Sequence, residues 1–151
     1  MEITIKILEL IAVLSSAMFT GAAVYISFVE HPARMSCGTE LAITEFIPSY
    51  RRATVMQASL ALISFFSAIL VGIILKEFIW ILAGLIIGIV IPFTIFLMMP
   101  TNKALENESL DKSSLLARQL LTKWGKLHFV RSFLSFISLL IQMVLSMSDR
   151  I

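Results

Sequence analysis

Four long apolar segments constrain the fold of this chain more strongly than any other feature. They cover about residues 3–29, 53–75, 78–99 and 127–147. A helix of about 20 apolar residues crosses the hydrocarbon core of a bilayer, and only a structure that pairs its backbone groups internally is stable there. Apolar amino acids make up 58% of the 151 residues, so the spans and their connections account for the whole chain. The sequence therefore predicts an all-α fold, an integral membrane four-helix bundle in the lipid bilayer, formed as a single domain by residues 1–151.

The first segment is predicted to be a retained helix rather than a cleaved signal peptide. Glu2 makes its beginning acidic, Glu9 interrupts its apolar core, and the apolar run continues well past the alanines at its middle. Glu9 lies about one helical turn inside the span, so we expect it to reach the outer interface. A proton or cation site at Glu9 is the alternative.

Two connections between the spans are long and one is very short. Lys76 and Glu77 alone join the second span to the third, which predicts a tight antiparallel hairpin. Residues 30–52 and 100–126 are predicted to be loops on the other side of the membrane. In the second of these, leucines recur at helical spacing among charged residues, which predicts a short amphipathic interfacial helix before the fourth span. These leucines are Leu110, Leu115, Leu116, Leu120 and Leu121.

The distribution of basic residues predicts the orientation. Nine of the twelve Lys and Arg residues belong to the side of the two long loops, and only Lys6, Lys76 and Arg150 belong to the other. Because cytoplasmic loops carry an excess of Lys and Arg, we expect loops 30–52 and 100–126 in the cytoplasm and both termini outside. The net charge of +2 is too small to indicate nucleic acid as a partner.

Gly84 and Gly88 form one pair of small residues four positions apart on the third span. Such a pair lets two helix backbones approach closely. The partner helix is either another span of the same chain or the same face of a second copy in a homo-oligomer.

Polar and aromatic residues gather where the helices meet the two long loops. They are Glu30 and His31 after the first span, Tyr50, Arg51 and Gln57 at the start of the second, Asn102 after the third, and Trp124, His128 and Arg131 at the start of the fourth. The last three have the spacing i, i+4, i+7, which places them on one helical face. Since neighbouring spans run antiparallel, these helix ends meet at one membrane level, and the sequence predicts a polar site there.

A simpler interpretation is that these residues anchor the protein at the membrane surface. Trp, Tyr and Arg are enriched at the interface whatever a membrane protein does, which applies best to Trp124, Tyr50 and Arg51. Arg131 lies past the start of an apolar run, where an ionisable side chain normally faces the interior of the bundle. His128 and Arg131 are therefore the stronger candidates for a functional role.

Several familiar catalytic motifs are missing from the sequence. It has no Cys-x-x-Cys, no His-x-x-x-His pair, no phosphate-binding glycine loop and no nucleophile elbow. Its single cysteine, Cys37, has no partner for an intrachain disulfide. These absences argue against nucleotide hydrolysis and standard zinc proteolysis.

Four short motifs make the chain resemble a known family. They are Ser27-Phe-Val-Glu-His-Pro-Ala-Arg34, Pro48-Ser-Tyr-Arg-Arg-Ala53, Pro100-Thr-Asn-Lys-Ala-Leu105 and Trp124…His128…Arg131. Together they resemble the anthrone oxygenase-like membrane family, most of whose members are known only as a domain of unknown function. The resemblance extends over essentially the whole chain.

The resemblance implies a four-helix membrane fold and oxygen chemistry on a hydrophobic polycyclic phenol, because some relatives oxidise an anthrone methylene to a ketone. On that hypothesis a histidine acts as general base, basic and amide groups hold the oxyanion, aromatic side chains sandwich the rings, and the carbanion reduces O₂ without a cofactor. The residues are His128 or His31 as base, Arg131 and Asn102 at the oxyanion, Trp124 and Tyr50 at the rings, and Arg51, Gln57 and Glu30 as further substrate contacts.

Two other functions stay open on the sequence. One is a redox protein in which His31 and His128 bind copper, iron or haem. The other is a non-catalytic protein that binds a hydrophobic small molecule or serves as a scaffold in a membrane complex.

Overall fold

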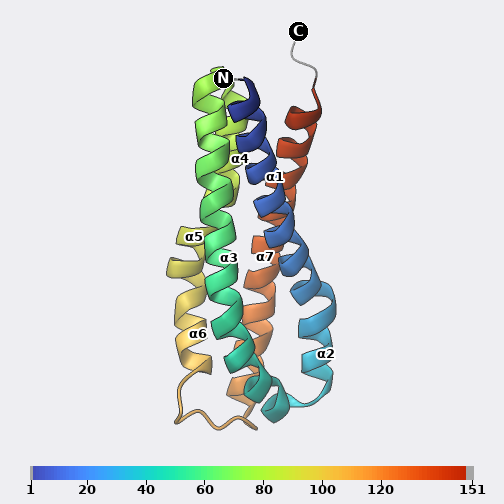
Figure 1. Cartoon of the computed structure of the whole chain (residues 1–151). Coiled ribbons are helices and arrows are strands. Elements are labelled where there is room, and N and C mark those ends of the chain that lie inside the picture. Colours follow the sequence, from blue (N-terminus) through green and yellow to red (C-terminus); the bar gives the residue numbers. More distant parts are fainter. Residues whose placement is uncertain (1, 149–151) are drawn as a thin grey trace.

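Four long helical rods lie side by side in the computed structural model, which describes residues 2–148 (Figure 1). The first rod consists of α1 (Glu2–Tyr25), the π-helical turn η1 (Ile26–Glu30) and α2 (His31–Ser36). The second rod is α3 (Thr39–Leu75) alone. No strand occurs within residues 2–148. Arg150, which entered the charge count above, lies outside the described residues.

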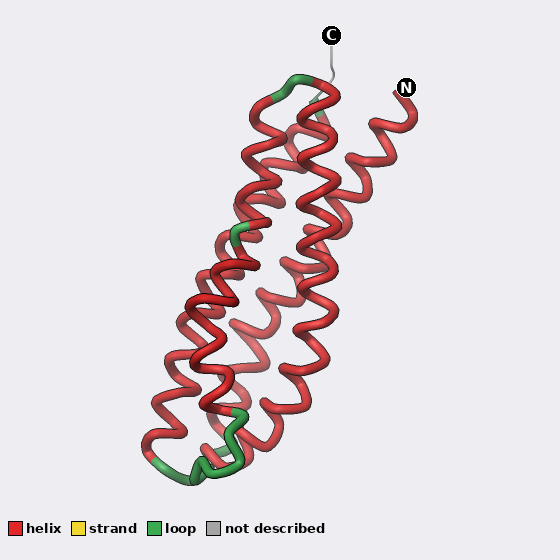
Figure 2. Tube along the Cα trace, turned by 90° about the vertical axis from the view of Figure 1, so that its left-hand side faces the viewer, coloured by secondary structure: helices red, strands yellow, loops and turns green. Residues whose placement is uncertain are grey.

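The third rod is the most irregular and the fourth is a single helix. The third consists of α4 (Phe78–Gly88), α5 (Val90–Phe93), the π-helical turn η2 (Thr94–Met98) and α6 (Met99–Leu105). The fourth is α7 (Leu115–Met147). Figure 2 shows the short connections at both ends of the bundle and the interruption between α4 and α5.

Each of the four rods is long and apolar enough to cross a membrane, so the chain is an integral multi-pass membrane protein. Large apolar side chains point outward along the spans, as Phe66 and Val144 do with exposed fractions of 57% and 65%. The buried positions between the rods are instead rich in Ala and Ser. Small residues allow helices to approach one another closely. In a membrane this close packing matters because the hydrophobic effect does not drive helices together.

The two segments predicted as long loops are mostly helical, which corrects the sequence interpretation. Only Cys37 and Gly38 separate α2 from α3, and Gly38 has a φ of +90°, which favours glycine. Only residues 106–114 separate α6 from α7. The amphipathic leucines from Leu115 onward are the first turns of α7, which continues into the span without a break. These ends stay helical because Phe46, Leu105 and Leu121 pack there in an apolar cluster of their own.

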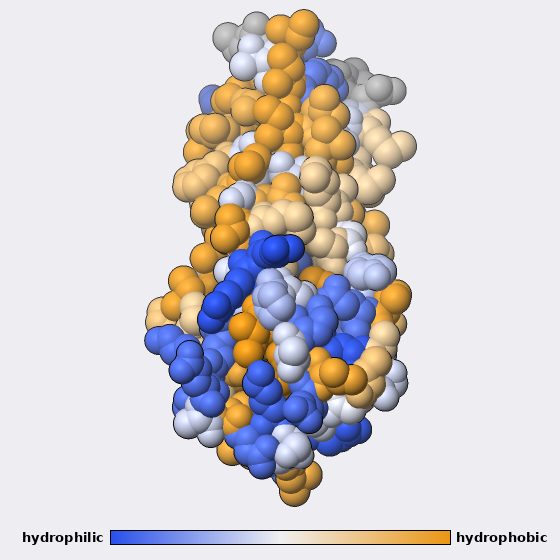
Figure 3. All heavy atoms as spheres, turned by 60° about the horizontal axis from the view of Figure 1, so that its bottom comes forward, coloured by the Kyte–Doolittle hydropathy of each residue, from blue (hydrophilic) through white to orange (hydrophobic). Residues whose placement is uncertain are grey.

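The helices are therefore longer than the membrane requires. α3 has 37 residues, which is about 55 Å of helix against a hydrocarbon core of about 30 Å. Figure 3 shows hydrophilic residues gathered at the end that carries α2 and α6, and mostly apolar residues along the middle of the bundle. One end of the bundle thus extends beyond the hydrocarbon.

The glycine pair on α4 packs inside the chain. A Cβ atom on Gly84 would lie 3.1 Å from Ile69, and one on Gly88 would lie 2.6 Å from the Phe65 ring. Both contacts belong to α3, which agrees with the first of the two partners considered above. This face of α4 is already filled by α3.

Candidate functional site

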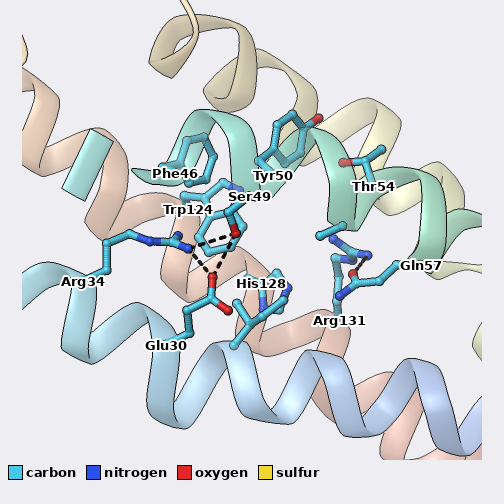
Figure 4. A pocket seen from close by; sticks show the side chains of 12 residues that line it. Glu30, Arg34, Phe46, Ser49, Tyr50, Thr54, Gln57, Trp124, His128 and Arg131 are labelled. Carbon is cyan, nitrogen blue, oxygen red and sulfur yellow. Dashed lines mark hydrogen bonds and ion pairs between the residues drawn. The ribbon is translucent and has the colours of Figure 1, made fainter. Parts of the chain in front are cut away.

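A small polar cavity lies among the helices, at the level where the hydrophilic end begins. Its lining residues come from η1, α2, α3 and α7 (Figure 4): Ile26, Glu30, Arg34, Phe46, Ser49, Tyr50, Ala53, Thr54, Gln57, Trp124, His128 and Arg131. We call it the central cavity. Its volume is about 20 Å³, which is room for about one water molecule.

The α7 face predicted from the i, i+4, i+7 spacing lines this cavity. Trp124, His128 and Arg131 have exposed fractions of 4%, 1% and 9%. The Trp124 and His128 rings stack with centroids 4.7 Å apart and planes 26° apart. Side chains this deeply buried are held by packing, so simple anchoring at the membrane surface does not describe them.

A chain of hydroxyl groups reaches the His128 ring. Ser132 Oγ lies 2.9 Å from the Ala23 carbonyl oxygen, 3.2 Å from that of His128 and 2.8 Å from Ser27 Oγ. Ser27 Oγ lies in turn 3.0 Å from Nδ1 of His128. In the arrangement that directs the Ser132 hydrogen to a carbonyl, Ser27 donates to Ser132 and Nδ1 donates to Ser27, which leaves Nε2 with a lone pair. Nε2 makes no hydrogen bond within residues 2–148.

Arg131 is a buried charge without a counter-ion. One terminal nitrogen donates to Gln57 Oε1 at 2.8 Å, the other contacts Met98 Sδ at 4.0 Å, and the group lies 5.5 Å from the Phe19 ring centroid. Within the described part of the chain, no carboxylate oxygen lies within 4.0 Å of it. A buried charge normally has a partner, so this position favours an anionic ligand.

The opposite wall of the cavity is an ionic network. Arg34, whose role the sequence did not suggest, forms ion pairs with Glu30 and Glu45. Ser49 Oγ donates to Glu30 Oε1 at 3.0 Å. One oxygen of the Glu30 carboxylate, Oε1, is thus bound by both Arg34 and Ser49.

Three of the residues predicted for the site do not line the central cavity. The Arg51 side chain is 67% exposed and pairs with Glu106 at 2.8 Å. Asn102 is fully buried and donates to the Tyr50 hydroxyl at 2.9 Å, so it supports a lining residue from behind. His31 packs against Gly125 and Trp124.

His31 and His128 are therefore not presented to one cavity as a pair of metal ligands. The indole of Trp124 contacts both rings, at centroid distances of 5.3 Å and 4.7 Å. The described residues contain no cluster of three or more His, Cys, Asp or Glu that could hold a metal ion. His31 lines neither the central cavity nor the two larger cavities beside it, so a metal ion in the central cavity would have His128 as its one histidine ligand.

The close contact of His31 with α7 predicts a cost for adding a single methyl group. A Cβ atom on Gly125 would lie 2.4 Å from His31 Nε2. We expect Gly125→Ala to lower the free energy of unfolding by about 1–3 kcal/mol, because the ring must shift in a packed environment. Gly21→Ala is the matched control, since nothing lies within 4 Å of its added methyl group. Thermal unfolding in detergent tests this, and equal stability of the two variants would contradict the contact.

Two larger cavities adjoin the central one. The first, of about 170 Å³, shares Thr54, Gln57 and Arg131 with it. The second, of about 500 Å³, shares Glu30 and Arg34. The central cavity alone is too small for a ligand of several rings, so binding one requires space from a neighbour.

A family model described as anthrone oxygenase matches residues 46–141, well over half of the sequence. This chain belongs to the anthrone oxygenase family. The region of the anthrone oxygenase match includes Tyr50, Gln57 and the buried face of α7, whereas Glu30 and Arg34 precede it. Neither a curated protein nor a solved structure matches the chain.

Some members of the site were not identified from the sequence. Ser27, Ser132 and Ser49 are hydrogen-bonded to candidate residues. Serines are common in membrane helices for packing, so nothing in their type singles them out. Ser27 and Ser49 do lie inside two of the motifs that carry the family resemblance, and Ser132 follows His128 by one helical turn.

Proposed function

We propose that this protein is a membrane oxygenase that converts the acidic methylene of an anthrone-like hydrophobic phenol to a ketone with O₂. The observation that supports the proposal is a pairing on one face of α7. His128 lines the central cavity with its Nε2 unbonded within residues 2–148, and the uncompensated Arg131 lies beside it. A base and a cation in one cavity suit a reaction that removes a proton and leaves an anion.

The proposed reaction begins with proton transfer. Nε2 of His128 takes one proton from the methylene, and the electron pair delocalises through the rings onto the carbonyl oxygen of the anthrone. Arg131 and the amide of Gln57 stabilise that oxygen in a site with little water. Trp124 and Tyr50 lie against the flat rings, and Asn102 holds the Tyr50 hydroxyl in place.

The oxidation itself balances without a further reactant. The carbanion transfers its electrons to O₂ and forms a carbon–oxygen bond, and return of the proton gives a hydroperoxide on the former methylene carbon. This carbon then loses its remaining hydrogen while the O–O bond breaks. The products are the ketone and one water, so one oxygen atom of O₂ ends in each.

The test is O₂ consumption by purified protein in lipid nanodiscs with an anthrone as substrate. We expect equimolar consumption of anthrone and O₂, and ¹⁸O from labelled O₂ in the new ketone. A rate no higher than that in empty nanodiscs would refute the oxygenase and favour the non-catalytic alternative. Stoichiometric copper, iron or haem in the active protein would favour the redox alternative instead, and elemental analysis with a visible spectrum measures this.

We also propose that the hydrophilic end of the bundle faces the cytoplasm. Its support is the excess of Lys and Arg on that side. Cys37, the one cysteine of the chain, is exposed at the turn between α2 and α3 and provides a native label.

Labelling of Cys37 tests the orientation. A membrane-impermeant maleimide is expected to react with Cys37 in inside-out vesicles and not in intact cells. Lys76→Cys in a Cys37→Ser background, at the opposite end of the bundle, is expected to show the reverse pattern. Labelling of Cys37 from outside intact cells would overturn the assignment.

A further inference from the structure

The 170 Å³ cavity beside Arg131 has an apolar wall and a polar inner end. Three of its lining residues, Thr54, Gln57 and Arg131, also line the central cavity. The remaining lining residues are apolar except for Thr94, and they include Ala58, Val90 and Ile95. We call it the side cavity.

The rim of the side cavity lies on the surface that faces lipid. Ala58 on α3 is exposed, and Ile95 in η2 has an exposed fraction of 51%. Both residues belong to helices long and apolar enough to span the membrane. A molecule dissolved in the bilayer can therefore reach this rim without first entering water.

The wall on the third rod is the least regular part of the bundle. α4 ends at Gly88, α5 has four residues, and the π-helical turn η2 follows directly. π-Helical turns occur frequently at functional sites, because the extra residue changes which side chains face inward. The Thr94 hydroxyl donates to the Val90 carbonyl at 2.7 Å, so this wall offers a ligand little besides apolar contact.

Two residues at the inner end of the side cavity, Gln57 and Arg131, carry hydrogen-bond donors without an acceptor, and the third, Thr54, carries a hydroxyl that can donate or accept. Gln57 Oε1 already accepts from Arg131, and Gln57 Nε2 and Arg131 Nε are both buried without an acceptor. An unpaired buried donor is costly, and the positive charge adds to that cost. The group that completes this end must accept hydrogen bonds, and a negative charge on it would also neutralise Arg131.

We propose that the side cavity is a lateral entrance and binding site for flat apolar molecules that carry an anionic oxygen, a phenolate or a carboxylate. The anionic oxygen binds Gln57 and Arg131, while the apolar body lies between α3 and the α5–η2 segment, with any larger part still in the bilayer. The role of the side cavity as a route for substrate rests on the oxygenase function proposed above. Its role as a binding site does not depend on turnover.

Binding is measured with anthracene-2-carboxylate in nanodiscs of uncharged lipid, by energy transfer from tryptophan to the anthracene. Anthracene without the carboxylate is the comparison for the charge. We expect the carboxylate to bind at least about tenfold more tightly, as for a charge-assisted hydrogen bond of 1.5–3 kcal/mol. Equal affinity of the two probes would overturn the proposed anion site.

Filling the rim tests the location. Ala58→Phe places a ring in the mouth of the side cavity and is expected to weaken carboxylate binding by about tenfold or more. Val55→Phe is the matched control, because Val55 lies on the same helix, is 71% exposed and lines neither cavity. Wild-type affinity in Ala58→Phe would overturn the lateral entrance.

The two proposals fail in different ways. Anthracene-2-carboxylate binding that Ala58→Phe weakens, in a protein that consumes no O₂ with anthrone, would refute the oxygenase and support the binding site. Normal O₂ consumption in Ala58→Phe, with unchanged KM for the anthrone, would refute the lateral entrance and support the oxygenase. Loss of O₂ consumption in Ala58→Phe but not in Val55→Phe would support both.

Discussion

Arg131→Gln is expected to lower kcat/KM for anthrone oxidation by about 100- to 1,000-fold, the usual cost of removing a group that stabilises an oxyanion. Glutamine keeps a hydrogen-bond donor but removes the positive charge. Within the described residues, that charge has no counter-ion. Arg131→Lys is expected to retain more activity, because the charge remains while the planar fork is lost. Oxygen consumption at several anthrone concentrations in nanodiscs measures these effects.

Arg51→Gln is the control for this variant. It removes the same charge from a side chain that is 67% exposed and paired with Glu106 at the surface, and we expect activity within about twofold of wild type. Stability separates the two explanations of an Arg131 effect. Removing an unpaired buried charge should leave the unfolding temperature unchanged or raise it, so a large loss of stability in Arg131→Gln would show that the group is structural.

His128→Ala is expected to lower kcat/KM by about 100- to 10,000-fold, the range for removal of a general base. Added imidazole should restore part of the rate, because it can enter the space left by the ring. A wild-type rate in His128→Ala would show that another group removes the proton. Rate loss without any rescue, in protein that is also unstable, would indicate a packing role against Trp124.

Loss of a serine hydroxyl behind His128 is expected to lower the rate of oxidation measurably, but less than loss of His128 itself. Ser132→Ala removes the acceptor that directs the Ser27 hydrogen away from Nδ1. The ring can then take the other tautomer, and we expect a rate loss of about tenfold, smaller than that for losing the base. Ser146→Ala is the control, because the Ser146 hydroxyl is exposed and donates only to the Met143 carbonyl of its own helix.

The centres of the four helices were predictable from the sequence, but their lengths were not. Hydropathy reports which residues face lipid, so it ends a span where the chain becomes polar, near Ala53 in α3. A helix does not need contact with lipid in order to form. α3 begins 14 residues earlier, at Thr39, because Phe46 and its neighbours pack beyond the hydrocarbon. The polar segments were read as loops for this reason.

The geometry of the candidate site was predictable where the helix is regular. The spacing of Trp124, His128 and Arg131 needs only a period of 3.6 residues, and α7 keeps that period throughout. On the first rod, η1 inserts a wider turn directly before His31, which rotates all that follows relative to an ideal helix. The positions of His31 and Arg34 depend on that turn and on the absence of a side chain at Gly125, and neither can be read from spacing.

The extension of the bundle beyond the hydrocarbon sets the depth of the candidate site. Counted along α3, Gln57 lies 18 residues from Leu75, which is about 27 Å, so Arg131 lies near the far edge of a core about 30 Å thick. A small change in bilayer thickness would move this charge across the boundary between headgroups and acyl chains. Hydrophobic mismatch therefore acts directly on the candidate site, since a thicker membrane submerges Arg131 and a thinner one admits water to it. We therefore expect lipid composition to change the affinity of the proposed ligand site, alongside the residues that line its cavities.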